Sequence, residues 1–375
     1  MKLYNIGFFE LIPDIINCFF FGFLFLFFFK KYKINSIFLF ISIISLAFPF
    51  LIYFLWDWSY LPDQSKYAHS VYNIRNFNYE EIAAAHLFDR VFFASVLMAL
   101  FPIPFVNTII SVSIINKSLL LLSIFIFLKN KMVPNALIFL LLLSPSYIVI
   151  SSLALRDLLV ILSSIMFAYY FFKNKKILKT FFFLILIFFL KPHLAIYIII
   201  ISLAYYWFFN FNIKLINKFI ISLFLSIFLF YVILKLWYIF ENIRFGFISE
   251  TLNYTLNIKS FNDEPKTIFL FLFSFIEFVL LPISKNIFTL KNFIIFFENF
   301  IFIFYYVFYL IRIYKNNKFK AVFWIIILLF TSTLAGYLVH NEGTLWRYKI
   351  ILQTLLLFLI YFDLNNTLKK NNLGF

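Results

Sequence analysis

Apolar runs about as long as a membrane-spanning helix recur along most of the chain and are separated by short polar segments. The hydrocarbon core of a bilayer is about 30 Å thick, and a helix needs roughly 20 apolar residues to cross it. The pattern therefore predicts an all-α, polytopic integral membrane protein with about 11 transmembrane helices (range roughly 10–13). We place the spans at residues 14–29, 37–56, 105–128, 136–150, 153–172, 180–190, 193–209, 219–240, 293–313, 322–339 and 350–362.

Two further apolar segments are too short or too interrupted to count as spans. Residues 91–101 are followed by a turn with two prolines, and residues 267–282 contain Glu277. We expect one or two re-entrant or interfacial segments at these places. The sequence shows no internal repeat, no cleavable signal peptide and no soluble domain, so residues 1–375 are predicted to form a single transmembrane domain.

The distribution of charge predicts the orientation of the spans. Cytoplasmic connections carry an excess of Lys and Arg, and alternate connections of this chain are basic, with Asp363 their only acid. Alternating spans then place the N-terminus and the loops 57–90 and 241–266 outside, and the C-terminus inside. The basic connections carry Lys30, Lys31, Lys33, Lys129, Lys131, Lys173, Lys175, Lys176, Lys179, Lys214, Lys218, Arg312, Lys315, Lys318, Lys320, Lys369 and Lys370. We therefore assign the net charge of +16 to topology and to contact with anionic lipid of the bilayer, not to nucleic acid.

Composition narrows the class of function. Hydrophobic residues make up 64% and charged residues 13% of the chain, and we interpret the 62 Phe as lipid-facing side chains. Cys18 is the only cysteine, which excludes an intramolecular disulfide. The chain has no Walker A motif, and its four histidines lack metal-ligand spacing. We therefore expect neither a cofactor nor a metal.

Three cations near the predicted outer ends of spans form the main candidate site. Arg156 closes the stretch Ser-Ser-Leu-Ala-Leu-Arg, Lys191 lies in a Lys-Pro-His turn between two spans, and Arg347 precedes the last span. These positions run against the positive-inside tendency, and Arg binds phosphate through a fork of donors. We interpret Arg156, Lys191 and Arg347 as a pyrophosphate-binding site. The alternative is a set of structural ion pairs, above all Arg156 with Asp157.

The first long outer loop offers residues for contact with a glycan. Asp63 lies among aromatic residues that include Trp58 and Tyr67, and aromatic rings can stack on sugars. Trp58, Tyr67 and Glu342, the last of these in the loop before the final span, are the candidate glycan-binding residues. The alternative is that the aromatic residues form an interfacial belt and that the carboxylates are solvated loop charges.

With these residues the chain resembles the bacterial oligosaccharide repeat-unit polymerases of the O-antigen and capsule type. The likeness consists of Asp63 and Tyr67 in an early outer loop, Leu-Arg-Asp at Arg156, Lys-Pro at Lys191, and Asn-Glu-Gly-Thr-Leu-Trp-Arg-Tyr at residues 341–348. The resemblance implies an enzyme of the inner (cytoplasmic) membrane with a periplasmic N-terminus and periplasmic long loops. Such an enzyme joins glycans linked to undecaprenyl pyrophosphate on the periplasmic face, in polysaccharide biosynthesis, with a chain-length regulator as a further partner.

Glycosyl transfer between two such lipids requires a base for the acceptor hydroxyl and stabilisation of the leaving pyrophosphate. His193, beside Lys191, and Asp63, within the aromatic cluster, are the two candidate catalytic residues. Fixed cations can stabilise the leaving group, so we expect a metal-independent glycosyltransferase.

Two other classes of protein stay open. A lipid-linked C-type glycosyltransferase usually carries a carboxylate pair after its first helix, whereas Asp57 and Asp63 follow the second span here. A lipid-linked oligosaccharide flippase or other transporter would line a path through the bilayer with polar groups. Lys117, in the middle of a span, favours transport, while the other candidate cations gather near one face.

Overall fold

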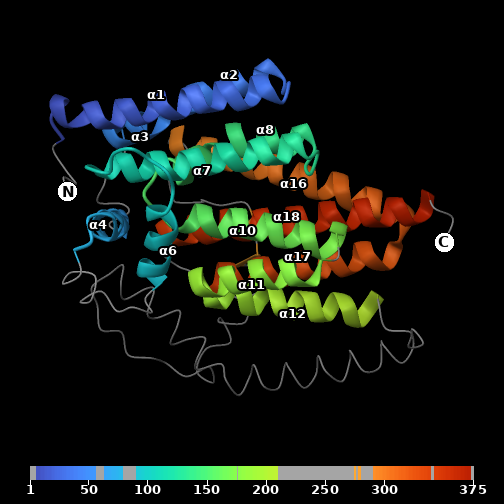
Figure 1. The fold of residues 1–375 in the computed structure, drawn as a ribbon. Helices are drawn as coiled ribbons and strands as arrows, with labels where there is room; N and C mark the ends of the chain where they lie inside the picture. Colours follow the sequence, from blue (N-terminus) through green and yellow to red (C-terminus); the bar gives the residue numbers. More distant parts are fainter. Residues whose placement is uncertain are drawn as a thin grey trace, which may run out of the picture. The chain divides into compact units, whose positions relative to one another are not determined.

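The computed structural model describes residues 6–55, 63–78, 90–174, 176–209, 274–275, 278–279, 290–338 and 342–372. All regular elements within these ranges are helices, as Figure 1 shows, which agrees with the predicted all-α class. The chain divides into two compact units, Met1–Pro192 and His193–Phe375.

The first unit is built around a central helix, α7. Among the described helices, α7 packs against α1, α3, α4, α6, α8, α9 and α10, and most of its side chains are buried. In Figure 1, α7 lies between α1 and α10. The helices of this unit are α1 (Phe8–Lys31), α2 (Ser36–Ser45), α3 (Phe48–Leu55), α4 (Asp63–Arg75), α6 (Arg90–Ala99), α7 (Ile109–Lys129), α8 (Asn135–Leu143), α9 (Pro145–Ser151), α10 (Asp157–Tyr169), the π-helix η2 (Tyr170–Asn174) and α11 (Ile177–Leu190).

One side of α1 is packed into the unit, and its buried residues follow the helical period. Asp14, Asn17, Phe21, Phe25 and Phe29 are the buried positions of this helix, three or four residues apart. Residues at these spacings lie on one face of a helix, so α1 presents a stripe that is polar near its start and aromatic further along. The opposite face exposes large apolar side chains, as a lipid-facing helix does.

The polar part of this stripe fixes the start of α7. The Asp14 carboxylate accepts hydrogen bonds from the hydroxyls of Thr108 (2.7 Å) and Ser111, and Thr108 is itself the N-cap of α7. Asn17 donates to the carbonyl of Phe105 (2.8 Å) and accepts from the Phe105 amide (3.2 Å). A negative charge at a helix N-terminus is stabilised by the helix dipole, so α1 caps α7 as well as packing beside it.

The predicted outer loop 57–90 contains a helix, α4, that packs against α6. The guanidinium of Arg75 donates to the carbonyls of Ala99 (3.1 Å), Phe101 (3.1 Å) and Ile103 (2.7 Å), at the end of α6 and just beyond it. These carbonyls lack a partner within the helix, so Arg75 closes the end of α6. At 10 residues α6 is too short to span a bilayer as a helix, in keeping with the interfacial or re-entrant segment predicted at 91–101.

The predicted spans 136–150 and 153–172 are interrupted. Ser144 is extended (φ −66°, ψ 131°) and separates α8 from α9, because a residue before proline is disfavoured in the helical region. Residues 152–156 are not α-helical, so α10 begins at Asp157. The sequence pattern predicts a start at residue 153, which is wrong. After 13 residues α10 passes into the π-helix η2. The pattern of apolar residues did not reveal these interruptions because the residues on both sides are apolar.

The second unit contains α12 (Pro192–Phe209), α16 (Leu290–Asn316), α17 (Lys318–Leu338) and α18 (Glu342–Asn372). α16, α17 and α18 all pack against one another. From Lys349 to Leu364 nearly every side chain of α18 is buried, so this helix forms the core of the unit. Four described residues of the predicted re-entrant segment 267–282 also belong here, and Ser274 and Phe278 are buried.

Among the described residues, 7 segments are long and apolar enough to cross a membrane. This supports a multi-pass α-helical membrane protein, but it does not establish the predicted count of about 11. The segments at 136–150, 153–172 and 180–190 correspond to shorter helices, and 219–240 and the loop 241–266 lie outside the described residues. The candidate spans are Phe8–Lys31, Ser36–Leu55, Ile109–Lys129, Pro192–Phe209, Phe293–Asn316, Lys318–Gly336 and Trp346–Leu368.

Candidate functional site

The non-helical connection between α9 and α10 is the main candidate site. It contains Arg156, one of the predicted pyrophosphate ligands, and Ser152–Leu155 are buried. Irregular backbone at membrane depth is tolerated where protein buries it or where it lines a polar cavity, because its polar groups need partners. Such interruptions also place the N-terminus of a short helix where an anion can approach it.

α7 supplies partners for this connection. The side-chain amide of Asn116 donates to the carbonyls of Leu153 (2.6 Å) and Leu155 (2.7 Å). Asn116 is fully buried. One side chain of α7 therefore satisfies two carbonyls that a continuous helix would have satisfied within itself.

Lys117, the next residue of α7, is a buried cation. It is 1% exposed, its ammonium donates to the Ser151 hydroxyl (2.8 Å), and it lies 5.2 Å from the centre of the Phe48 ring. No carboxylate forms an ion pair with Lys117 in the part of the chain that the structure describes. An ionisable group inside a membrane helix is costly and marks a functional site by default.

Arg156 is half-buried and stands at the N-cap of α10. Its Nε atom is buried and has no hydrogen-bond partner in the described structure. The exposed NH groups at the start of a helix carry a partial positive charge. Arg156 therefore adds a full positive charge, and an Nε donor without a partner in the described structure, to a helix end that already favours anions.

Lys191 and Asp157 connect the ends of α11 and α10. Lys191 directly follows α11, and its ammonium lies 3.6 Å from Oδ1 of Asp157, with both side chains buried. No ion pair joins Arg156 to Asp157 within the described residues, so the alternative pair considered from the sequence is not the one that forms. Lys117 thus contacts the end of α9 and Lys191 the start of α10, on the two sides of the connection that carries Arg156, and Asp157 is the carboxylate that pairs with Lys191. The excess charge of this group is positive and suits an anion.

The other predicted residues of the first unit lie elsewhere. Asp63 begins α4 and forms an ion pair with Lys66 (3.6 Å), and both side chains are largely accessible. Tyr67, one turn further along α4, is 3% exposed. The predicted glycan-binding residue Trp58 lies outside the described residues.

The remaining predicted residues belong to the second unit. His193 is exposed near the start of α12 and stacks on the ring of Tyr348, with the ring centres 5.3 Å apart. Arg347 precedes Tyr348 in α18 and is half-buried. Glu342 is the first residue of α18, and its side chain is outside what the structure describes. His193, the predicted base, therefore contacts the residue that follows Arg347 in the sequence.

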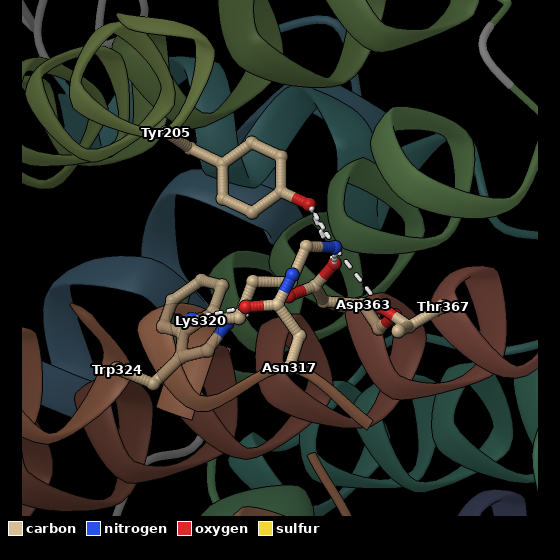
Figure 2. Close-up of polar contacts among 6 residues, drawn as sticks. All are labelled: Tyr205, Asn317, Lys320, Trp324, Asp363 and Thr367. Carbon is tan, nitrogen blue, oxygen red and sulfur yellow. Dashed lines mark hydrogen bonds and ion pairs between the residues drawn. The ribbon is translucent and has the colours of Figure 1, made fainter. Parts of the chain in front are cut away.

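The second unit also holds a buried polar cluster, which Figure 2 shows. The ammonium of Lys320 lies 2.6 Å from Oδ1 of Asp363 and also donates to Thr367 (3.0 Å). Tyr205 donates to the same carboxylate oxygen (2.5 Å), and the indole NH of Trp324 donates to the other (2.9 Å). Both oxygens are satisfied, so this cluster joins α12, α17 and α18 as a structural connection.

Sequence reasoning missed Asn116 and treated Lys117 only as an exception. The signal was present, because Asn116 and Lys117 are the amide and the charged side chain of a run, 109–128, that otherwise holds apolar residues and serines. What the sequence could not show was their partners, since the carbonyls that Asn116 binds lie 37 and 39 residues away in the chain.

No protein-family model, curated protein or solved structure matches this chain. The fold and its apolar helices define the class, an α-helical multi-pass membrane protein.

Proposed function

We propose that this protein polymerises oligosaccharide repeat units linked to undecaprenyl pyrophosphate, on the periplasmic face of a bacterial inner membrane. The observation that carries the proposal is Arg156, whose buried Nε has no partner among the described residues and which stands at the N-terminus of α10. A lipid pyrophosphate has its tail in the bilayer and its charge at the interface. Its chemistry therefore suits a cationic helix end within an apolar protein.

In this proposal the cations act on the leaving group. When the glycosidic bond to the donor breaks, negative charge develops on the pyrophosphate, and fixed positive groups stabilise that charge. Arg156 can contact two oxygens at once, while Lys191 offers a single charge shared with Asp157. Arg347, which belongs to the second unit, stays a predicted pyrophosphate ligand. His193 and Asp63 are the candidate bases for the acceptor hydroxyl, and Trp58, Tyr67 and Glu342 the candidate glycan contacts.

The proposal includes a membrane arrangement of about 11 spans, with the N-terminus periplasmic and the C-terminus cytoplasmic. Single cysteines introduced by Ser70→Cys and Lys173→Cys, each in a Cys18→Ser background, test it. An impermeant thiol reagent added to cells with a permeabilised outer membrane should label position 70 and spare position 173. The reverse pattern would invert the topology and place the site on the wrong face for a periplasmic polymerase.

The reaction is tested with purified protein in lipid vesicles that contain an undecaprenyl-pyrophosphate-linked repeat unit. Longer lipid-linked glycans should form, and EDTA should leave their formation unchanged. Activity that EDTA abolishes and a divalent cation restores would instead favour a C-type glycosyltransferase. Unchanged substrate after prolonged incubation with active lipid-linked donor and acceptor would reject the polymerase.

A second function, transport of a lipid-linked oligosaccharide, is favoured by Lys117. This buried cation without a carboxylate partner among the described residues lies next to interrupted helices, an arrangement that transporters use for binding charged substrates. The same vesicles distinguish the two functions. Movement of intact lipid-linked glycan between leaflets, with no new glycosidic bond, identifies a transporter.

A further inference from the structure

The connection that positions Arg156 has few hydrogen bonds of its own. Within it, the Ser152 amide donates to Val149 (2.9 Å), and the Leu155 amide donates to the carbonyl of Leu153 (2.9 Å). Residues 153–155 read Leu-Ala-Leu, which are among the best helix formers. Nothing in this local sequence breaks a helix, and apolar surroundings favour helix further. Contacts from outside the segment must therefore keep it non-helical.

Asn116 provides those contacts. Its amide nitrogen carries two hydrogens, and the carbonyls of Leu153 (2.6 Å) and Leu155 (2.7 Å) each take one. Leu155 directly precedes Arg156, so the second bond fixes the peptide that leads into the guanidinium-bearing residue. Lys117 holds the other end of the connection through the hydroxyl of Ser151.

We propose that Asn116 is a positioning residue for the anion site, which holds Arg156 where it meets the charged group of a lipid pyrophosphate. The inference rests on the proposed function, because it assigns Arg156 to an anion. Without the two donors of Asn116, residues 152–156 extend the helix, and Arg156 moves from the N-cap into a helical turn. The charge is kept in that state, but the anion loses its arginine contact.

The first test is a double-mutant cycle on binding, with undecaprenyl pyrophosphate titrated into the full-length protein in nanodiscs. Asn116→Leu should raise Kd at least tenfold, and Asn116→Ser, which keeps one donor, should have an intermediate effect. In an Arg156→Ala background the same substitutions should change Kd less than twofold, because Asn116 acts through Arg156. Undecaprenol, which lacks the anion, should show no difference between variants.

Ser118→Ala is the matched control. It changes a buried residue two positions along α7 whose hydroxyl has no partner in the described structure, so Kd should not change. A loss of affinity in Asn116→Leu that is equally large without Arg156 would overturn the positioning role and leave a general structural one. Full affinity in Arg156→Ala would reject the anion site itself, and the positioning role with it.

A second measurement reports the geometry without any ligand. Ala154 lies buried between the two carbonyls that Asn116 binds. A cysteine placed there by Ala154→Cys, in a Cys18→Ser background, should change its rate of reaction with a thiol reagent at least tenfold when Asn116→Leu is added, because the backbone around position 154 changes conformation. An unchanged rate would show that Asn116 does not hold the segment, whatever the outcome for binding.

Discussion

The ammonium of Lys191 lies 3.6 Å from the carboxylate of Asp157, and both side chains are almost completely buried. Lys191, a predicted pyrophosphate ligand, therefore contacts the residue that follows Arg156, although 34 positions separate Lys191 from Asp157 in the sequence. Asp157 pairs with Lys191 and leaves Arg156 as the cation with spare donors. The pair has two separable roles: it neutralises a buried charge, and it holds the end of α11 near the start of α10.

The first prediction separates these roles. Asp157→Asn or Lys191→Met alone should lower the stability of the folded protein by about 3–5 kcal/mol, because each leaves a buried charge without its ion pair. The double variant should recover part of that loss, since neither remaining side chain carries a buried charge. Thermal unfolding of the purified proteins in detergent measures the effect.

Binding of undecaprenyl pyrophosphate to the double variant then tests Lys191 as a ligand. Weaker binding by a well-folded double variant would support direct contact of Lys191 with the anion. Wild-type affinity would limit Lys191 to the pairing of Asp157 and reduce the predicted set of cations to Arg156 and Arg347.

The second prediction compares two half-buried arginines. Arg156 has an unsatisfied Nε in the described structure, whereas Arg75 donates to three carbonyls at the end of α6. Arg75→Ala should therefore destabilise the protein by about 1–3 kcal/mol, because the carbonyls of Ala99 and Ile103 lose the guanidinium that donates to them, and Arg156→Ala should leave the unfolding temperature nearly unchanged.

Polymerisation should show the opposite order. Arg156→Ala should reduce turnover by about 10²-fold or more, and Arg156→Lys should remain impaired because it loses the fork of donors. An Arg156→Ala protein that is both destabilised and inactive would indicate a structural role for Arg156. Normal turnover at normal abundance would remove Arg156 from the site.

The helical class could be predicted from the sequence because the length of an apolar run is a local property. α1 shows how far this extends: the run predicted its course, and the spacing of Asp14, Asn17 and Phe21 agrees with one buried face. The role of Asp14 could not be predicted, because its partners Thr108 and Ser111 are more than 90 positions away. Hydrogen bonds between distant segments leave no periodic trace in a sequence.

The candidate site divides in the same way. Cations at span ends drew attention to Arg156 and Lys191 because they stand out against an apolar background, and the structure brings Lys191 into contact with Asp157, the residue after Arg156. Their role in binding an anion stays a prediction. The interruption at residues 152–156 was missed because Leu-Ala-Leu favours a helix, and only the amide of Asn116 reveals why the chain departs from one. The contributions of Asp63, His193 and Arg347 stay predictions.

The third prediction concerns the cluster in Figure 2. Asp363→Leu should cost about 3–5 kcal/mol, because Lys320 loses its ion pair and the Tyr205 and Trp324 donors lose their acceptor. Lys318→Met is the matched control, since Lys318 is exposed and begins α17, the helix that carries Lys320. It should change the unfolding temperature very little. Equal effects of the two substitutions would mean that the cluster does not hold these helices together.

The last prediction uses two glycines with opposite surroundings. A Cβ atom added at Gly336 in α17 would collide with the backbone carbonyl of Ser274 and crowd the side chain of Phe278, whereas a Cβ at Gly22 in α1 meets no atom within 4 Å. Both glycines lie within helices, where alanine is intrinsically favoured by about 0.5–1 kcal/mol. Gly22→Ala should therefore be neutral or stabilising. Gly336→Ala should destabilise by about 1–3 kcal/mol, because backbone must move to admit the methyl group. Thermal unfolding of the two variants, purified in the same detergent, measures this difference. A stabilised Gly336→Ala would show that Ser274 does not pack against α17, and that the close approach of these two segments is not part of the second unit.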